Sequence, residues 1–240
     1  MPNACVAMYG KYWNAFYQKT YATGKALWDV PPEQSVLEDQ QVFGPAFKQV
    51  GTVLDIGCGT GEQSKYLGRF YPKVIGVDAA PRAIEIANAL EHPPNVEFRV
   101  GDLSDKVFMD GLRMQFGDMN VYMRGVLHQI RQADREQVAN NLLHLIGDKG
   151  AIYLIEVGKD IKDYFRSAAN AFHELPDAVQ ETFISNLPPH GVDESEIATL
   201  FHREGYELSR HGTAFLKTNL LLKDGAPVKI PAVFGLIARN

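Results

Sequence analysis

Cysteine and metal-binding clusters are scarce in this sequence. The 240 residues contain two cysteines, Cys5 and Cys58, which cannot build a disulfide framework. Cys and His residues do not occur at zinc-ligand spacing, so we expect no metal site. A hydrophobic fraction of 45% is typical of a globular protein that buries a substantial core.

Long apolar runs and concentrated basic charge are also missing. No run reaches the roughly 18 apolar residues of a membrane-spanning helix, and the N-terminal stretch "MPNACVAMYGKYW" lacks the apolar segment of a signal peptide. The formal net charge is -5, without a Lys/Arg run of the kind that neutralises nucleic-acid phosphates. We therefore expect a cytoplasmic protein with no membrane span and no nucleic acid as substrate. Its oligomeric state cannot be inferred.

Apolar strand-like runs alternate with helix-like segments in the middle of the chain. We expect strands at 52–57, 73–78, 95–101, 119–124 and 150–157, and helices at 61–70, 81–91, 132–146 and 161–172. This alternation predicts parallel βαβ units with helices on both faces of a sheet. Extended segments at 206–216 and 228–238, with Asp224-Gly225 between them, predict an antiparallel hairpin at the end of the sheet.

Local signals mark several helix ends. Ser35 is a candidate N-cap for a helix that ends near Val50, and Gly147 is a candidate helix stop. Asp193, with Glu196 three residues later, has the capping-box arrangement.

A glycine-rich loop follows the first predicted strand. The stretch "VLDIGCGTGEQS", residues 53–64, places Gly57, Gly59 and Gly61 between an apolar run and a helix-like segment. Glycine permits positive φ and close approach of a ligand, and a helix start offers free N–H groups. The dinucleotide fingerprint G-x-G-x-x-G would need its third glycine at Glu62 or Ser64. The mismatch argues against an NAD-dependent oxidoreductase.

Acidic residues stand at the loop entrance and at the next two strand ends. Asp55 precedes the loop, where an acid suits a ligand with a cationic group. Asp78 ends the strand "KVIGVDAA" and can accept both hydroxyls of a ribose. Asp102 follows Gly101 and can accept the exocyclic amine of an adenine. Alternatively, Asp78 and Asp102 are merely turn residues.

The segments "LDIGCGTG", "VIGVDAA" and "VGDLSD", in this order and spacing, resemble three motifs of the class I S-adenosylmethionine-dependent methyltransferases. The resemblance covers about residues 50 to 157. It implies S-adenosylmethionine (SAM) as cofactor and an α/β, Rossmann-like methyltransferase fold. That fold has a mostly parallel seven-stranded sheet with an antiparallel C-terminal hairpin, here with an aromatic N-terminal helical lid. We expect one methyltransferase domain over 1–240, with the lid at 1–50, the SAM-binding core at 51–157, and acceptor-side helices and the hairpin at 158–240.

The resemblance also implies roles for individual residues. The glycine loop would line the methionine moiety, Asp78 would bind the ribose, and Asp102 with Leu103 would hold the adenine. Asp55 would orient the loop and face the cofactor's amino group. The cofactor-binding residues implied are Asp55, Gly57, Cys58, Gly59, Gly61, Asp78, Ala79, Asp102, Leu103 and Arg124. Cys58 is interpreted as a small loop filler rather than a reactive thiol.

The fourth motif region, "DMNVYMRGVLHQI", lacks the Asn/Asp-Pro-Pro-aromatic motif of enzymes that methylate nucleic-acid amines. Its "RGVLHQI" segment resembles the same region of small-molecule methyltransferases. His128 is the candidate general base, because histidine ordinarily titrates near neutral pH. Alternatively, His128 only packs against a helix. With a carboxylate acceptor, which needs no base, it would orient the substrate instead.

An aromatic N-terminal segment is the candidate acceptor lid. Its rings recur at helical spacing, and Phe165 is a further candidate for the pocket wall. The predicted substrate-binding residues are Tyr9, Trp13, Tyr17, Trp28 and Phe165. Alternatively, the aromatic face simply docks on the sheet. An aromatic pocket favours a small, lipophilic acceptor.

O-methylation is the favoured reaction, on a carboxylate such as a fatty acid or on a hydroxyl. The chain is loosely similar to bacterial fatty-acid O-methyltransferases. The alternatives are N- or S-methylation of a small heterocycle, and a non-catalytic SAM-binding regulatory protein.

Overall fold

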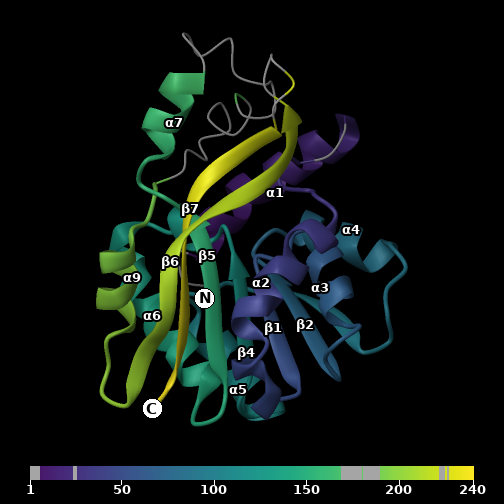
Figure 1. Ribbon diagram of the computed structural model, residues 1–240. Helices are drawn as coiled ribbons and strands as arrows, with labels where there is room; N and C mark the ends of the chain where they lie inside the picture. Colours follow the sequence, from purple (N-terminus) through teal and green to yellow (C-terminus); the bar gives the residue numbers. More distant parts are fainter. Residues whose placement is uncertain (1–5, 24–25, 169–179, 181–189, 222–224, 226) are drawn as a thin grey trace.

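A seven-stranded sheet forms the centre of the protein in the computed structural model, which describes residues 6–23, 26–168, 180, 190–221, 225 and 227–240 (Figure 1). The strand order is β3-β2-β1-β4-β5-β7-β6. The parallel strands are β1 (Thr52–Ile56), β2 (Lys73–Asp78), β3 (Val96–Val100), β4 (Asn120–Arg124) and β5 (Ala151–Val157). β6 (Tyr206–Leu221) and β7 (Pro227–Arg239) form an antiparallel pair, and β7 also pairs antiparallel with β5. The expected fold class is confirmed.

Helices cover both faces of the sheet because successive strand residues point to opposite sides. In β1, Val53 packs in one core cluster and Leu54 in the other. One face carries α2 (Val36–Phe43), α3 (Glu62–Leu67) and α4 (Pro81–Ala89). The opposite face carries α5 (Lys106–Phe116), α6 (Gln132–Ile146) and α9 (Glu194–Phe201). The other helices of the described residues are α1 (Val6–Thr23), α7 (Ile161–Ala168) and the short 3-10 turns η1 (Pro32–Gln34), η2 (Ala46–Gln49) and η3 (Leu127–Gln129).

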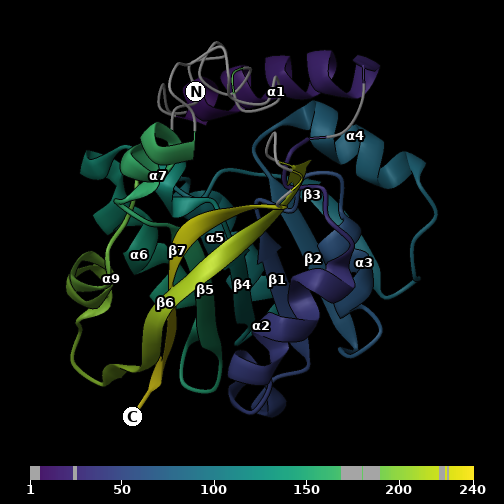
Figure 2. The same ribbon diagram turned by 45° about the horizontal axis from the view of Figure 1, so that its top comes forward.

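Two elements extend over the carboxyl ends of the parallel strands. Figure 2 shows α1 lying across one end of the molecule, above α4. Asn14 Oδ1 accepts a hydrogen bond from the Arg82 amide at the start of α4, at 2.9 Å, and so fixes this crossing. The β6–β7 hairpin extends toward α1 (Figures 1 and 2), where the Asn219 amide donates to the Leu27 carbonyl at 2.9 Å. A site at these strand ends is therefore covered from two sides.

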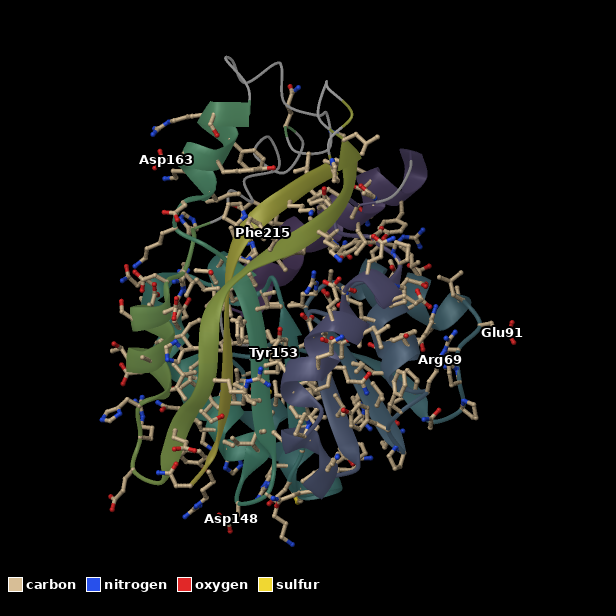
Figure 3. All side chains as sticks on the ribbon, viewed as in Figure 1. Arg69, Glu91, Asp148, Tyr153, Asp163 and Phe215 are labelled. Atoms are coloured by element: carbon tan, nitrogen blue, oxygen red, sulfur yellow. The ribbon has the colours of Figure 1, made fainter. Side chains whose placement is uncertain are left out.

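The hairpin and the sheet differ in how they bury their side chains. All residues of β5 are buried, as expected for a central strand. Figure 3 shows the labelled Tyr153 within the sheet and Phe215 on the hairpin. Tyr153 is 2% exposed and Phe215 is 60% exposed. No helix in the described part of the chain is long and apolar enough to cross a membrane.

Some local predictions differ from the structure. The helix expected from Ser35 to Val50 is divided into α2 and η2, and the Ser35 hydroxyl donates to the Pro32 carbonyl instead of capping α2. No helix was expected where α5 lies, although Asp105 caps it by accepting from the Val107 amide at 2.9 Å. Both hairpin strands are longer than predicted.

Other local predictions hold, and some cannot be assessed. Asp193 accepts from the Glu196 amide at 2.8 Å as an N-cap, and Gly147 ends α6. The Asp224-Gly225 turn and the end of the 161–172 helix fall largely outside the described residues.

Candidate cofactor and acceptor site

A pocket lies at the carboxyl ends of the parallel strands, beneath α1 and beside the β6–β7 hairpin. It brings together residues from segments far apart in the sequence. The predicted site residues that line it are Trp13, Tyr17, Trp28, Gly57, Cys58, Gly59, Asp78, Ala79, Asp102, Leu103, Arg124, His128 and Phe165. The side chain of Tyr9 lies outside the described residues.

The glycine loop takes a conformation that larger residues would disturb. Gly57 and Gly59 have φ of 67° and 55°, in the left-handed region that favours glycine. A Cβ atom on Gly57 would lie 2.3 Å from Cγ2 of Val126, and one on Gly59 would lie 2.7 Å from the hydroxyl of Tyr17. Between the two glycines, burial and the nearby Asp78 charge raise the pKa of the Cys58 thiol, which favours the unreactive protonated form.

Asp78 connects the loop to the end of β2. One carboxylate oxygen accepts from the Gly59 amide at 3.0 Å and the other from the Ala80 amide at 2.8 Å. Burial raises the pKa of this carboxyl to about 6, against the lowering effect of the two amides. The carboxyl group therefore fixes the loop and at the same time lines the pocket.

Asp102 presents an unsatisfied acceptor at the end of β3. Its Oδ1 accepts from the amide and the hydroxyl of Ser104, at 2.8 and 2.6 Å. Its Oδ2 is buried without a hydrogen-bond partner among the described residues. A buried acceptor of this kind costs free energy unless a donor reaches it. An amine N–H of a ligand in the pocket would supply that donor, so the residues present fit an adenine-bearing cofactor.

Two predicted cofactor-binding residues, Asp55 and Gly61, are not among the residues that line the pocket. Asp55 lies on the face of β1 that carries α3, where its Oδ2 accepts from the Ser64 hydroxyl at 2.5 Å. Gly61 packs against β3, since a Cβ atom there would lie 2.4 Å from Cζ of Phe98. Both residues can shape the loop, and their contacts with the cofactor stay predictions.

The aromatic side chains of α1 pack over the glycine loop and against one another. Tyr17 is 3% exposed, and its ring stacks on that of Tyr21 at a centroid distance of 5.7 Å. The Tyr21 hydroxyl donates to Asp29. Phe16 stacks on Trp28 at 5.2 Å. The aromatic residues of this segment therefore both pack on the protein core and line the pocket. The two alternative roles predicted for them do not exclude each other.

His128 sits on the η3 turn directly after β4 and is 7% exposed. Its Nδ1 lies 3.0 Å from Oε2 of Glu156, which is fully buried in β5. The same carboxylate accepts from the amides of residues 126, 127 and 128, at 3.0, 2.9 and 3.2 Å. This carboxylate in turn favours the imidazole tautomer with its proton on Nδ1 and with Nε2 as the basic nitrogen.

Arg124 ends β4, which lies on the opposite side of β1 from the adenine-binding candidates. Its Nη1 donates to Oδ2 of Asp39 at 2.9 Å. Asp39, on α2, also accepts from the hydroxyls of Tyr122 and Tyr153, at 2.7 and 2.9 Å. The buried ion pair is thus hydrogen-bonded on both carboxylate oxygens, which is what makes such a pair tolerable in a protein interior.

Sequence reasoning missed Glu156 and Asp39. The sequence could have indicated Glu156, because it is the one acid in the apolar run "AIYLIEV" of β5. It could not have indicated Asp39, which stands among other polar residues and whose tyrosine partners are 83 and 114 residues away. In the described part of the chain, no group of three or more His, Cys, Asp or Glu residues is arranged to hold a metal ion.

Comparisons with known proteins agree with this geometry. A family model described as a methyltransferase domain matches residues 53–150. The crystal structure of a SAM-dependent methyltransferase from Anabaena variabilis is 29% identical with a TM-score of 0.89, and the match covers 96% of this chain and 95% of that chain.

Curated relatives match shorter segments. A 2-heptyl-1-hydroxyquinolin-4(1H)-one methyltransferase from Mycobacteroides abscessus is 30% identical over 112 residues, which are 42% of this chain and 48% of the relative. An uncharacterized RNA methyltransferase from Bacillus cereus is 38% identical over 84 residues, 33% of this chain and 18% of the relative. The chain therefore spans less than half the length of these two relatives.

The sheet order and the domain match agree with the class I SAM-dependent methyltransferases that the sequence motifs resemble. Residues 53–150 carry a methyltransferase domain, and SAM is its cofactor.

Proposed function

We propose that the protein transfers the methyl group of SAM to an oxygen atom of a small, lipophilic acceptor, either a carboxylate such as that of a fatty acid or a hydroxyl. The observation that carries the proposal is the His128–Glu156 pair at the pocket, with Nδ1 and Oε2 3.0 Å apart. This pair supplies a positioned base next to a cofactor site, which suits an acceptor that must lose a proton.

The cofactor half of the site is assigned to the ends of β1, β2 and β3. Gly57, Cys58 and Gly59 would hold the methionine moiety, Asp78 with Ala79 the ribose, and Asp102 with Leu103 the adenine; all of them line the pocket. SAM supplies a methyl group on a sulfonium centre, whose transfer is an in-line substitution. The unpartnered Oδ2 of Asp102 supports the adenine assignment, because an exocyclic amine would complete its hydrogen bonding.

The chain's own contribution is alignment and exclusion of water. Tyr17 packs over Gly59, and Trp13 and Trp28 close the pocket beside it. Aromatic faces at this place also attract a cationic sulfonium. For a hydroxyl acceptor, Nε2 of His128 takes up the proton that the acceptor loses. For a carboxylate acceptor, the same nitrogen orients the substrate.

A lipophilic acceptor is supported by the other half of the pocket. Ile161 and Phe165 from α7 line it together with Leu216 and Ile230 from the hairpin. The mycobacterial relative is named for an acceptor with an apolar heptyl chain and a hydroxyl group. Methylation of nitrogen or sulfur in a small heterocycle is the competing reaction, and a non-catalytic SAM-binding role is the competing function.

Turnover separates these functions. The purified protein is incubated with SAM and matched lipophilic acceptors that carry a hydroxyl, a carboxylate, an amine or a thiol, and release of S-adenosylhomocysteine is measured. The proposal predicts release with the oxygen acceptors. Release confined to the amine or the thiol would contradict O-methylation, and SAM binding without release from any acceptor would favour the regulatory role.

A further inference from the structure

Arg124 lines the pocket from a strand on the side of β1 away from the acids assigned to the cofactor. It ends β4 and lies beside Ile155 of β5, whereas the acids assigned to the cofactor end β2 and β3 on the other side of β1. Asp39, its partner in the ion pair, also binds Tyr153 of β5. The sequence groups Arg124 with the cofactor residues, but its contacts lie on α2, β4 and β5.

The guanidinium group of Arg124 is held in place and has further N–H donors. It carries five N–H groups in a planar fork. Nη1 donates to Asp39, and the Tyr122 hydroxyl is a second neighbour of the group. These contacts leave donors for a ligand in the pocket that Arg124 lines. The side chain is 9% exposed, so a ligand oxygen that reached it would be largely shielded from water.

A second cation lies on the same side. Lys217 of β6 lines the pocket, and its Nζ pairs with Glu38. Glu38 directly precedes Asp39 on α2, so two neighbouring acids hold two cations that both line the pocket. Of these acids, Glu38 is largely exposed, at 60%, and water screens much of its charge.

An apolar surface adjoins the two cations. Val157, Ile161, Leu216 and Ile230 belong to one core cluster and also line the pocket. A ligand that filled this half would place an apolar body on these four side chains and a polar group near Arg124.

We propose that Arg124 is a specificity-determining residue that binds an anionic oxygen group on the acceptor, so that the acceptor is a lipophilic organic acid. This inference rests on the proposed function for the identity of the site. Arginine suits the role because its fork donates two parallel charge-assisted hydrogen bonds to a carboxylate. Lys217 adds positive charge at longer range, and the apolar side chains receive the hydrocarbon part.

Binding of matched probes tests the assignment without requiring turnover. Octanoate, octanol and octylamine share one chain length and differ in the head group. Each is titrated by calorimetry into the protein saturated with S-adenosylhomocysteine, at neutral pH. We expect octanoate to bind about tenfold or more tightly than octanol, the advantage of a charge-assisted hydrogen bond. Equal affinity, or binding of neither probe, would overturn the proposal.

Variants then identify the group responsible. Arg124→Met alone would leave Asp39 as a buried unpaired charge and could unfold the protein, so the test uses Arg124→Met with Asp39→Asn, which removes both charges. Arg124→Lys, which keeps the charge but loses the fork, is the second variant. The double variant should lose the octanoate preference and keep its affinity for S-adenosylhomocysteine, and Arg124→Lys should retain only part of the preference.

The control is Arg99→Met, since Arg99 bonds to Gln115 on the surface, away from the pocket. This variant should leave the affinities for octanoate and for S-adenosylhomocysteine unchanged. A weakened affinity for S-adenosylhomocysteine in the double variant, with the octanoate preference intact, would return Arg124 to the cofactor site. The acceptor assay above reports on methyl transfer independently, because probe binding does not require it.

Discussion

Nδ1 of His128 lies 3.0 Å from Oε2 of Glu156, and this contact joins the turn after β4 to the end of β5. The same carboxylate accepts the amide hydrogens of the turn, so the backbone and the imidazole are positioned by one buried group. Rigid support of this kind is what a base needs if its other nitrogen is to meet a substrate.

Replacement of His128 by Asn should lower the rate of methyl transfer to a hydroxyl acceptor. The loss expected for a general base is about 10²–10⁴-fold in kcat, with the dissociation constant of SAM nearly unchanged. Stopped assays and calorimetry give the two quantities. His144→Asn is the matched control, because His144 is a half-exposed histidine on α6 paired with Asp110. If kcat stays unchanged in His128→Asn, His128 is not the base.

Asp78 should make cofactor binding depend on pH. Burial raises the pKa of its carboxyl to about 6, so at lower pH the group is protonated and is a poorer acceptor for ribose hydroxyls. We expect the affinity for SAM to rise as the pH increases through about 6, and Asp78→Asn to bind more weakly with a flatter pH profile. Calorimetry at several pH values measures this. Parallel profiles for the two proteins would contradict the assignment.

Asp55 should make the folded protein less stable as the pH rises, whereas an acid in a salt bridge makes it more stable. Burial raises the pKa of its carboxyl from 3.8 to about 7, so the folded state holds the proton more tightly than the unfolded state does. The free energy of unfolding of the cofactor-free protein should therefore decrease as the pH rises from about 4 to about 7. In Asp55→Asn, this decrease should be smaller.

Urea denaturation at several pH values measures the effect. The control is Asp163→Asn on α7, where the acid side chain is 77% exposed. The control should keep the wild-type slope. If Asp55→Asn also keeps it, the carboxyl does not titrate in this range.

The loop and the lid should be coupled through Gly59 and Tyr17. A Cβ atom on Gly59 would lie 2.7 Å from the Tyr17 hydroxyl, at a backbone position with φ of 55°. Gly59→Ala should lower the free energy of unfolding by about 1–3 kcal/mol through crowding and backbone strain. Tyr17→Phe, which removes the hydroxyl, should recover part of that loss in the double variant. Strictly additive effects in this double-mutant cycle would contradict the contact.

Local sequence patterns predicted the parallel strands and the glycine loop well. Apolar runs and glycines specify β1 to β5 and the loop, so the sequence alone places Asp78 and Asp102 at the strand ends. Alternation along β1 could also have shown that Asp55 faces α3, since Val53 and Asp55 share one face. The helix α5 was not predicted, although its apolar residues suit an amphipathic helix; Gly111 inside it is unfavourable to a helix.

Long-range partners could not be predicted from the same patterns. Asp39 is buried only because α2 folds onto Tyr122 and Tyr153, and no local feature of α2 indicates those contacts. The role of Arg124 depends on Asp39 in turn. The pairing of His128 with Glu156 likewise spans 28 residues and two strands.

The most direct test of the proposed reaction is the identity of the atom that receives the methyl group. SAM labelled with ¹³C in its methyl group is incubated with the protein and a lipophilic organic acid or phenol, and the product is examined by NMR spectroscopy. The account predicts a labelled methyl carbon bonded to oxygen, as a methyl ester or a methoxy group. A labelled methyl on nitrogen or sulfur, or label that remains entirely on SAM bound to the protein, would contradict it.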